Sequence, residues 1–109
     1  FKEAVRGAHV VYPKAWCATP IFQPPIGENN PEKTQAIFDQ HKDWICTSEV
    51  MDLADKNAIY MHCLPCDRGF EVTNEVIDKT SGAGWLSAVF DQAENRLHVQ
   101  KAVMALVMG

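Results

Sequence analysis

Short apolar runs and longer segments of mixed polarity alternate along this chain. Three of the apolar runs are rich in β-branched and aromatic residues and have the length of buried strands: Ala8–Tyr12, Ala58–Met61 and Ala88–Phe90. Each is followed by residues that favour helices. Alternating strands and helices predict an α/β fold, in which a parallel sheet lies between helical layers as a three-layer sandwich. We expect an incomplete Rossmann-like domain.

Residues typical of helix N-termini precede most of the predicted helices. Asn30 with Pro31, Thr47 or Ser48, and Thr73 are such starts, and Asp91 with Glu94 fits a capping box. The predicted helices are a remnant at Phe1–Arg6 ending before Gly7, then Pro31–Lys42, Glu49–Ala54, Asn74–Asp78 and Gln92–Met108. A chain that opens inside a helix is expected to be a piece of a longer protein.

Two segments have no obvious place in a small sandwich. Residues 17–30 contain prolines, a glycine and asparagines, and their pattern is neither helical nor alternating. Such a long connection is either a substrate loop or a surface loop without structure. The last turns of the final helix, 102–108, are apolar on every side, which predicts burial against a further domain or subunit.

Composition excludes several classes of function. A length of 109 residues allows one small domain, and 47% hydrophobic residues are enough for a core. The net charge of −4 argues against nucleic acid as a partner, and the longest apolar run is far shorter than the roughly 18 residues of a membrane span. The four cysteines are interpreted as free thiols of a cytoplasmic protein.

The candidate chemistry follows the central strand. Pro65 cannot donate to a sheet, so it ends the strand and places Cys63 and Leu64 at the carboxyl end. Polar residues also follow the neighbouring strands, at 12–14 and 90–92. Because the carboxyl ends of parallel strands meet at one edge, these residues are expected to share a ligand site.

The cysteines also allow two other interpretations, a redox pair and a zinc site. Cys63 and Cys66 fit the C-x-x-C spacing of a redox pair, but the residues after them do not begin the helix that would activate the first thiol. His62, Cys63 and Cys66 offer three zinc ligands, but a matching second cluster is absent from the sequence. Both a redox module and a zinc site are therefore less favoured.

Arg96 is a candidate anion-binding residue. It lies in the second turn of the helix that follows the third strand, where a guanidinium near the helix N-terminus suits a phosphate group. Spacing alone does not distinguish this role from a surface salt bridge with Asp91 or Glu94.

Three blocks in order, MHCLP, EVTNEVID and VFDQAENRLHVQKAVMALV, resemble the carboxyl-terminal part of the ornithine/aspartate carbamoyltransferases. The resemblance implies transfer of a carbamoyl group from carbamoyl phosphate to the amine of an ornithine-like amino acid, without metal or organic cofactor. It implies that Cys63 and Leu64 position the reacting groups, that Leu64–Pro65 is cis, and that Arg96 contacts carbamoyl phosphate. It also implies a trimeric enzyme of arginine metabolism.

Some segments depart from the ornithine-specific pattern. The expected Ser-Met-Gly segment is replaced by residues 12–18, and VVYPKAW and HKDWICT resemble the knotted branch that uses N-acetylornithine. This branch implies substrate-binding roles for Lys14 and for Glu71, although surface charge is the alternative for each. The amine is therefore left open, and a noncatalytic, ligand-binding relative of the transferases is the second hypothesis.

The carbamoyl-phosphate motifs of the family, Ser-Thr-Arg-Thr and His-Pro-x-Gln, do not occur in this sequence. The resemblance assigns them to an amino-terminal domain. We therefore interpret residues 1–109 as the carboxyl-terminal part of the amino-acid-binding domain, with the last helix, about 92–108, packing on that missing domain. The fragment alone is expected to be inactive.

Overall fold

The structure is a computed structural model that describes residues 1–14 and 31–109. The predicted loop at 17–30 and the proposed cap at Asn30 lie outside the described residues. The elements in order are α1 (Lys2–Val5), β1 (Val10–Val11), α2 (Pro31–Gln40), α3 (Ser48–Met51), β2 (Ile59–Tyr60), α4 (Asn74–Ile77), β3 (Leu86–Ser87) and α5 (Val89–Met108).

The three strands form a parallel sheet in the order β1-β2-β3, which confirms the predicted α/β class. In the central strand, Tyr60 lies opposite Val11 of β1 and Ser87 of β3. The strands are short because backbone pairing ends where the chain turns polar, at Asp55–Asn57 before β2 and at His62 after it. Their carboxyl ends point to one edge, as expected.

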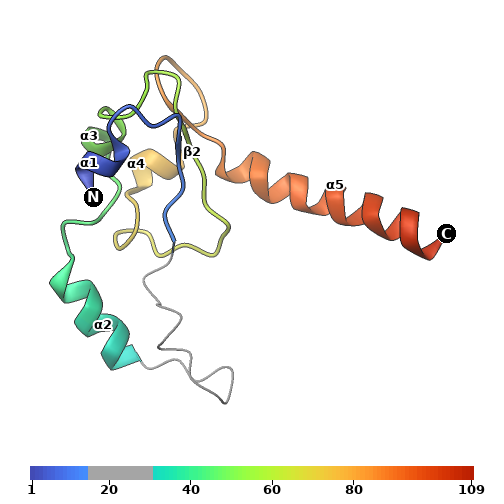
Figure 1. The fold of residues 1–109 in the computed structure, drawn as a ribbon, viewed down its shortest axis with the longest axis horizontal. Coiled ribbons are helices and arrows are strands. Elements are labelled where there is room, and N and C mark those ends of the chain that lie inside the picture. Colours follow the sequence, from blue (N-terminus) through green and yellow to red (C-terminus); the bar gives the residue numbers. More distant parts are fainter. Residues whose placement is uncertain (15–30) are drawn as a thin grey trace.

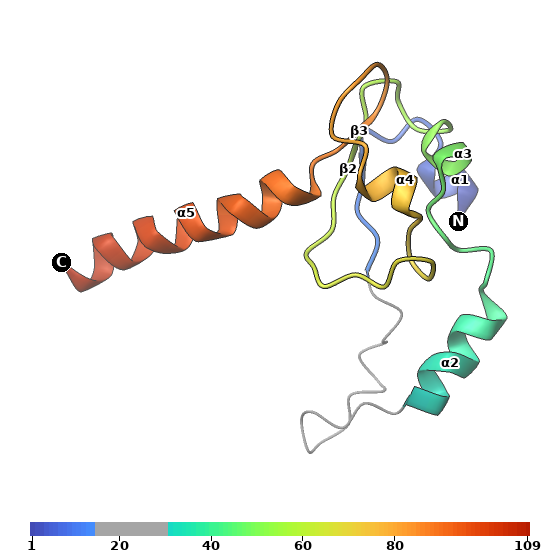
Figure 2. The ribbon, with the colours of Figure 1, turned by 180° about the vertical axis from the view of Figure 1, so that it is seen from behind.

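Helices α1, α3 and α4 lie on one side of the sheet, whereas α5 leaves in the opposite direction (Figures 1 and 2). Consecutive right-handed crossovers that move the same way across a sheet place their helices on the same face. Of the three expected layers, the described residues thus form two, the sheet and one helical layer. Contacts link α1 to α3 and α3 to α4, so that layer is continuous.

The core lies between the sheet and this helical layer. Tyr60, from the middle strand, and Met51, from α3, are fully buried, and burial of an apolar side chain such as that of Met51 contributes about 1.5–3 kcal/mol. The other buried apolar residues are Val5, Val11, Cys46, Val50, Ala58, Val72, Val76, Ile77, Trp85 and Val89. Trp85 is also fixed by a hydrogen bond from its indole N–H to Asp52 (2.8 Å).

The third strand and the final helix both begin earlier than predicted. Strand pairing occurs at Leu86–Ser87, and Ala88–Phe90, predicted as a strand, instead begins α5. Apolar β-branched residues suggested a strand, but Ala88 N–H already donates to Tyr60 of β2 and the next residues turn into the helix. The predicted capping box is therefore wrong, because Asp91 lies inside the helix and Ala88 occupies the N-cap.

The shorter helices agree with the predictions apart from their ends. Thr47 is the N-cap of α3 and accepts a hydrogen bond from Val50 N–H, as its position predicts. Thr73 occupies the N-cap of α4, although its side chain makes no capping bond. Helix α2 ends at Gln40, two residues before the predicted end.

The last helix carries its apolar residues outside the body of the domain (Figure 1). Its 20 residues correspond to about 30 Å of helix. Leu106, Val107 and Met108 are 84%, 74% and 78% exposed, respectively, so these side chains find no cover among the described residues. Within the described ranges no helix has the length and apolar character needed to cross a membrane.

Candidate active site at the strand ends

The side chain of Gln92 links the carboxyl ends of all three strands. The Gln92 side chain, in the first turn of α5, accepts a hydrogen bond from His62 N–H (3.1 Å) and donates another to the Tyr12 hydroxyl (2.9 Å). Tyr12 directly follows β1, and His62 lies two residues beyond β2. The strand ends therefore share one edge, as the sequence predicts.

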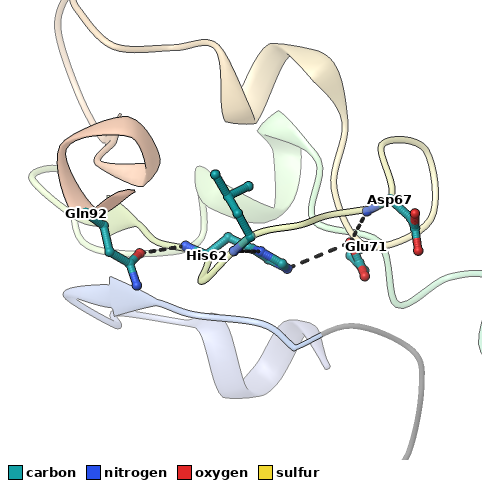
Figure 3. A network of polar contacts seen from close by, with 5 residues as sticks. His62, Asp67, Glu71 and Gln92 are labelled. Atoms are coloured by element: carbon teal, nitrogen blue, oxygen red, sulfur yellow. Dashed lines mark hydrogen bonds and ion pairs between the residues drawn. The ribbon is translucent and has the colours of Figure 1, made fainter. Parts of the chain in front are cut away.

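Behind this edge lies a buried polar network that contains His62 and Glu71 (Figure 3). His62 Nδ1 accepts a hydrogen bond from Leu64 N–H (3.0 Å), and its Nε2 lies 3.8 Å from Glu71 Oε2. The same Glu71 oxygen accepts a hydrogen bond from Asp67 N–H (2.7 Å). Both side chains are almost completely buried, at 0% and 1% exposure, so the network sits beneath the site.

The turn between the strand and this network presents Cys63 to the outside. Cys63 is exposed, whereas Leu64 is half-buried and packs against the core. The Leu64–Pro65 peptide bond is cis, which confirms the prediction, and Leu64 has a φ of +49°. The Leu64 N–H is bonded to His62, so this backbone donor is not available to a ligand.

The loop that carries Glu71 is held from two directions. Arg68 donates two hydrogen bonds to Asp78 (2.7 and 2.8 Å) and one to Asn74 (2.9 Å), which ties the loop to α4. These bonds lower the pKa of the Asp78 carboxyl and raise the pKa of Arg68. On the other side, Cys46 N–H donates to the Glu71 carbonyl (2.8 Å).

The described cysteines differ in their surroundings. Burial raises the pKa of the Cys46 thiol to about 12, and burial, with a smaller effect from Glu71, raises the pKa of Cys66. Neither Cys63 nor Cys66 begins a helix, since the next helix, α4, starts at Asn74. The redox interpretation therefore lacks the helix N-terminus that activates a C-x-x-C pair. Residues 1–14 and 31–109 contain no group of three or more His, Cys, Asp or Glu side chains arranged to hold a metal.

Arg96 lies on α5, one turn after Gln92. Residues four apart share a helix face, so Arg96 follows Gln92 along the side of α5 that meets the strand ends. It borders a shallow groove together with Gln92, Asn95, Val99 and Gln100. Among the described residues, Arg96 forms no salt bridge with Asp91 or Glu94, and Glu94 faces His98 instead (3.3 Å).

The remaining predicted site residues lie at different depths. Lys14 is exposed and follows Tyr12 by two residues, at the end of β1. Glu71 is buried under His62 rather than open to the surface. The sequence does not predict the roles of His62 and Gln92. His62 is visible beside Cys63 and Gln92 one turn before Arg96, but no local pattern predicts that the two residues are in contact across 30 residues.

Taken together, these observations define a class of protein: a parallel α/β domain whose ligand site lies at the carboxyl ends of its strands. Comparison with known protein families gives a match over residues 1–107 to the aspartate/ornithine carbamoyltransferase family, Asp/Orn binding domain. The chain belongs to this family.

Individual relatives point to the same family. Ornithine carbamoyltransferase from Hyperthermus butylicus is 46% identical over 108 residues, which are 98% of this chain and 30% of that protein. The corresponding enzyme from Caldicellulosiruptor saccharolyticus is 47% identical over 106 residues, 97% of this chain and 30% of that protein. The chain therefore spans about 30% of the length of these relatives.

Solved structures of two kinds are similar to this chain. Ornithine carbamoyltransferase from Pyrococcus furiosus gives a TM-score of 0.73 at 37% identity and covers 99% of this chain and 30% of that one. An acetylornithine transcarbamylase complexed with acetylcitrulline gives 0.74 at 40% identity, with 99% and 29% covered. The α/β architecture is thus common to transferases named for ornithine and for acetylornithine.

Proposed function

We propose that this chain is the amino-acid-binding part of an enzyme that moves the carbamoyl group of carbamoyl phosphate to the amine of an ornithine-like amino acid. One observation carries this proposal. The side chain of Gln92 binds the backbone of His62 and so fixes α5 against the end of β2, and Arg96 lies one helical turn after Gln92 on the same groove. Membership of the family supports the reaction class.

The reaction itself needs positioning and charge stabilisation. The amine lone pair attacks the carbamoyl carbon, a C–N bond forms, the C–O bond to phosphate breaks, and the departing phosphate takes up the proton that the amine loses. A guanidinium at Arg96 matches the phosphate oxygens in geometry and charge. Cys63 and the Leu64 carbonyl hold the carbamoyl group and the amine in place. Cys63 has no covalent role in this scheme, and no cofactor is required.

The amino-acid end of the substrate is assigned to the neighbouring strand. Lys14 follows β1 on the same edge, and its ammonium group suits the carboxylate of an amino acid. Glu71 supplies negative charge to this end only through His62, beneath which it is buried. Ornithine and N-acetylornithine are both candidate substrates, because both occur in the names of the similar structures.

The exposed apolar side of α5 supports a further part of the proposal. Exposed apolar side chains along a helix of this length indicate a surface that is covered in the complete protein. We assign this cover to the amino-terminal, carbamoyl-phosphate-binding domain of the parent enzyme. The parent is proposed to be a cytoplasmic trimer, and the 109 residues alone are proposed to be inactive.

The test is phosphate release from carbamoyl phosphate by the full-length protein, measured with ornithine, N-acetylornithine, N-succinylornithine, aspartate and simple diamines. Release that depends on one of these amines, with the matching ureido product found by mass spectrometry, supports the proposal and identifies the substrate. If carbamoyl phosphate binds but no amine stimulates release, a noncatalytic ligand-binding role replaces it.

A further inference from the structure

We infer that His62 and Glu71 act as a positioning pair that sets the direction of the Cys63–Leu64 peptide group. Its catalytic consequence rests on the proposed function. The pair has no direct contact with substrate in this scheme. Glu71 acts on the His62 ring, and the His62 ring acts on Leu64 N–H.

The hydrogen bond from Leu64 assigns the state of the histidine ring. A ring nitrogen that accepts a hydrogen bond carries no proton, so His62 Nδ1 is unprotonated. The neutral ring must then carry its proton on Nε2, the nitrogen that faces the Glu71 carboxylate. At 3.8 Å this contact is longer than a hydrogen bond, and it acts as an attraction between the carboxylate charge and the N–H dipole.

Glu71 is held so that its carboxylate stays on the histidine side. Its carbonyl accepts a hydrogen bond from Cys46 N–H, and its Oε2 accepts one from Asp67 N–H. Arg68, within the same loop, is fixed to Asp78. With 1% of its side chain exposed, Glu71 is placed to orient His62 rather than to meet a substrate directly.

His62 in turn fixes the segment proposed to hold the substrates. Its backbone N–H is bonded to Gln92, and its ring is bonded to Leu64 N–H, so the Cys63–Leu64 turn is closed from both ends. In the trans peptide bond between Cys63 and Leu64, the carbonyl opposite this N–H is that of Cys63, so the engaged N–H fixes the plane of this peptide group and the point at which Leu64 leaves it. Loss of the ring acceptor would release this peptide group to rotate.

Two amide substitutions at His62 separate the roles of its ring nitrogens. In His62→Asn the amide oxygen can replace Nδ1 as the acceptor for Leu64, whereas in His62→Gln the amide lies where Nε2 was. We expect kcat of the full-length enzyme to be about tenfold lower in His62→Gln than in His62→Asn, the factor given by one hydrogen bond of about 1.4 kcal/mol. Equal kcat values in the two variants would contradict the positioning role of Nδ1.

Glu71→Gln tests whether Glu71 acts through His62. We expect kcat to fall by a similar factor with every amine that is a substrate, while the KM for the amine changes little. A rise in the KM of one amine with kcat unchanged would show direct substrate contact and overturn the inference. Glu94→Gln is the matched control, because Glu94 also faces a histidine, His98, but at an exposed position.

A measurement without substrate separates this inference from the proposed function. Nitrogen-15 NMR of the full-length protein labelled at histidine, assigned with His62→Asn, reports which ring nitrogen is protonated. We expect Nε2–H in the wild type and a mixture of tautomers in Glu71→Gln. A wild-type Nδ1–H tautomer would overturn the inference even if the enzyme is active, whereas an inactive protein with the Nε2–H tautomer would overturn only the proposed function.

Discussion

The side-chain oxygen of Gln92 accepts a hydrogen bond from the backbone N–H of His62 at 3.1 Å, across 30 residues of sequence. This bond joins the start of α5 to the end of the central strand. The same side chain reaches Tyr12, so one glutamine connects three segments at the candidate site. The position of Arg96 relative to Cys63 depends on this connection.

Replacement of Gln92 by alanine should therefore weaken both stability and activity. Loss of a partner for a partly buried N–H costs about 1–3 kcal/mol in the free energy of unfolding. Urea denaturation of the full-length protein measures this change, and kcat should fall in parallel. Gln40→Ala, at the exposed end of α2, is the control. Equal effects of the two substitutions would show that the bridge does not stabilise the site.

The contact between Arg68 and Asp78 should make stability depend on acid pH. Arg68 lowers the pKa of the Asp78 carboxyl in the folded protein. The contact therefore stabilises the fold at pH values above the pKa of an unfolded aspartate, about 3.9, and this stabilisation is lost as the pH falls through the pKa of Asp78 in the folded protein. Asp78→Asn should lower Tm modestly at pH 7, and the two Tm values should converge near pH 2–3. A Tm difference that persists in acid would contradict this origin; Asp43→Asn, in the exposed turn after α2, is the control.

The thiols should react with an alkylating reagent in a fixed order. Of the cysteines in residues 1–14 and 31–109, Cys63 is exposed and should react first at pH 8, whereas Cys46 should stay unmodified in the folded protein, because burial holds its pKa near 12. Cys66, whose pKa is also raised, should react more slowly than Cys63. Peptide mass spectrometry after timed alkylation gives the order, and modification of Cys46 before Cys63 would be incompatible with this packing.

The cap of α3 should make a measurable contribution to stability. Thr47 accepts the hydrogen bond from Val50 N–H, and removal of an N-cap hydroxyl typically costs about 1 kcal/mol. Thr47→Ala should therefore lower the urea midpoint of the full-length protein. Thr80→Ala, at an exposed loop position, should leave it almost unchanged. If the two variants have the same midpoint, the hydroxyl is not a stabilising cap.

Local patterns were enough to predict most of the fold. The apolar run around Tyr60 and the break at Pro65 located the central strand and its carboxyl end, because these signals come from neighbouring residues. The third strand was misplaced, because its pairing is decided by contacts with β2 and not by the β-branched residues at Ala88–Phe90.

The candidate site was predictable in part for the same reason. Cys63, Leu64 and Arg96 were found from the strand end and from the resemblance to a family. The supporting bonds of His62 and Gln92 join residues far apart in sequence, and no local pattern encodes which side chain meets which backbone group. The burial of Glu71 was likewise invisible, because a charged residue beside a polar loop is usually exposed.

The most direct test of the central claim is amine-dependent phosphate release by the full-length protein with Arg96 replaced by alanine. Removal of one group that stabilises transition-state charge typically lowers kcat by about 10²–10³-fold. We expect a loss of this size in Arg96→Ala, and a change within about twofold in Lys101→Ala, an exposed cation on the same helix that is not among the groove residues. Full activity of Arg96→Ala would contradict the assignment of this edge as the carbamoyl-phosphate site.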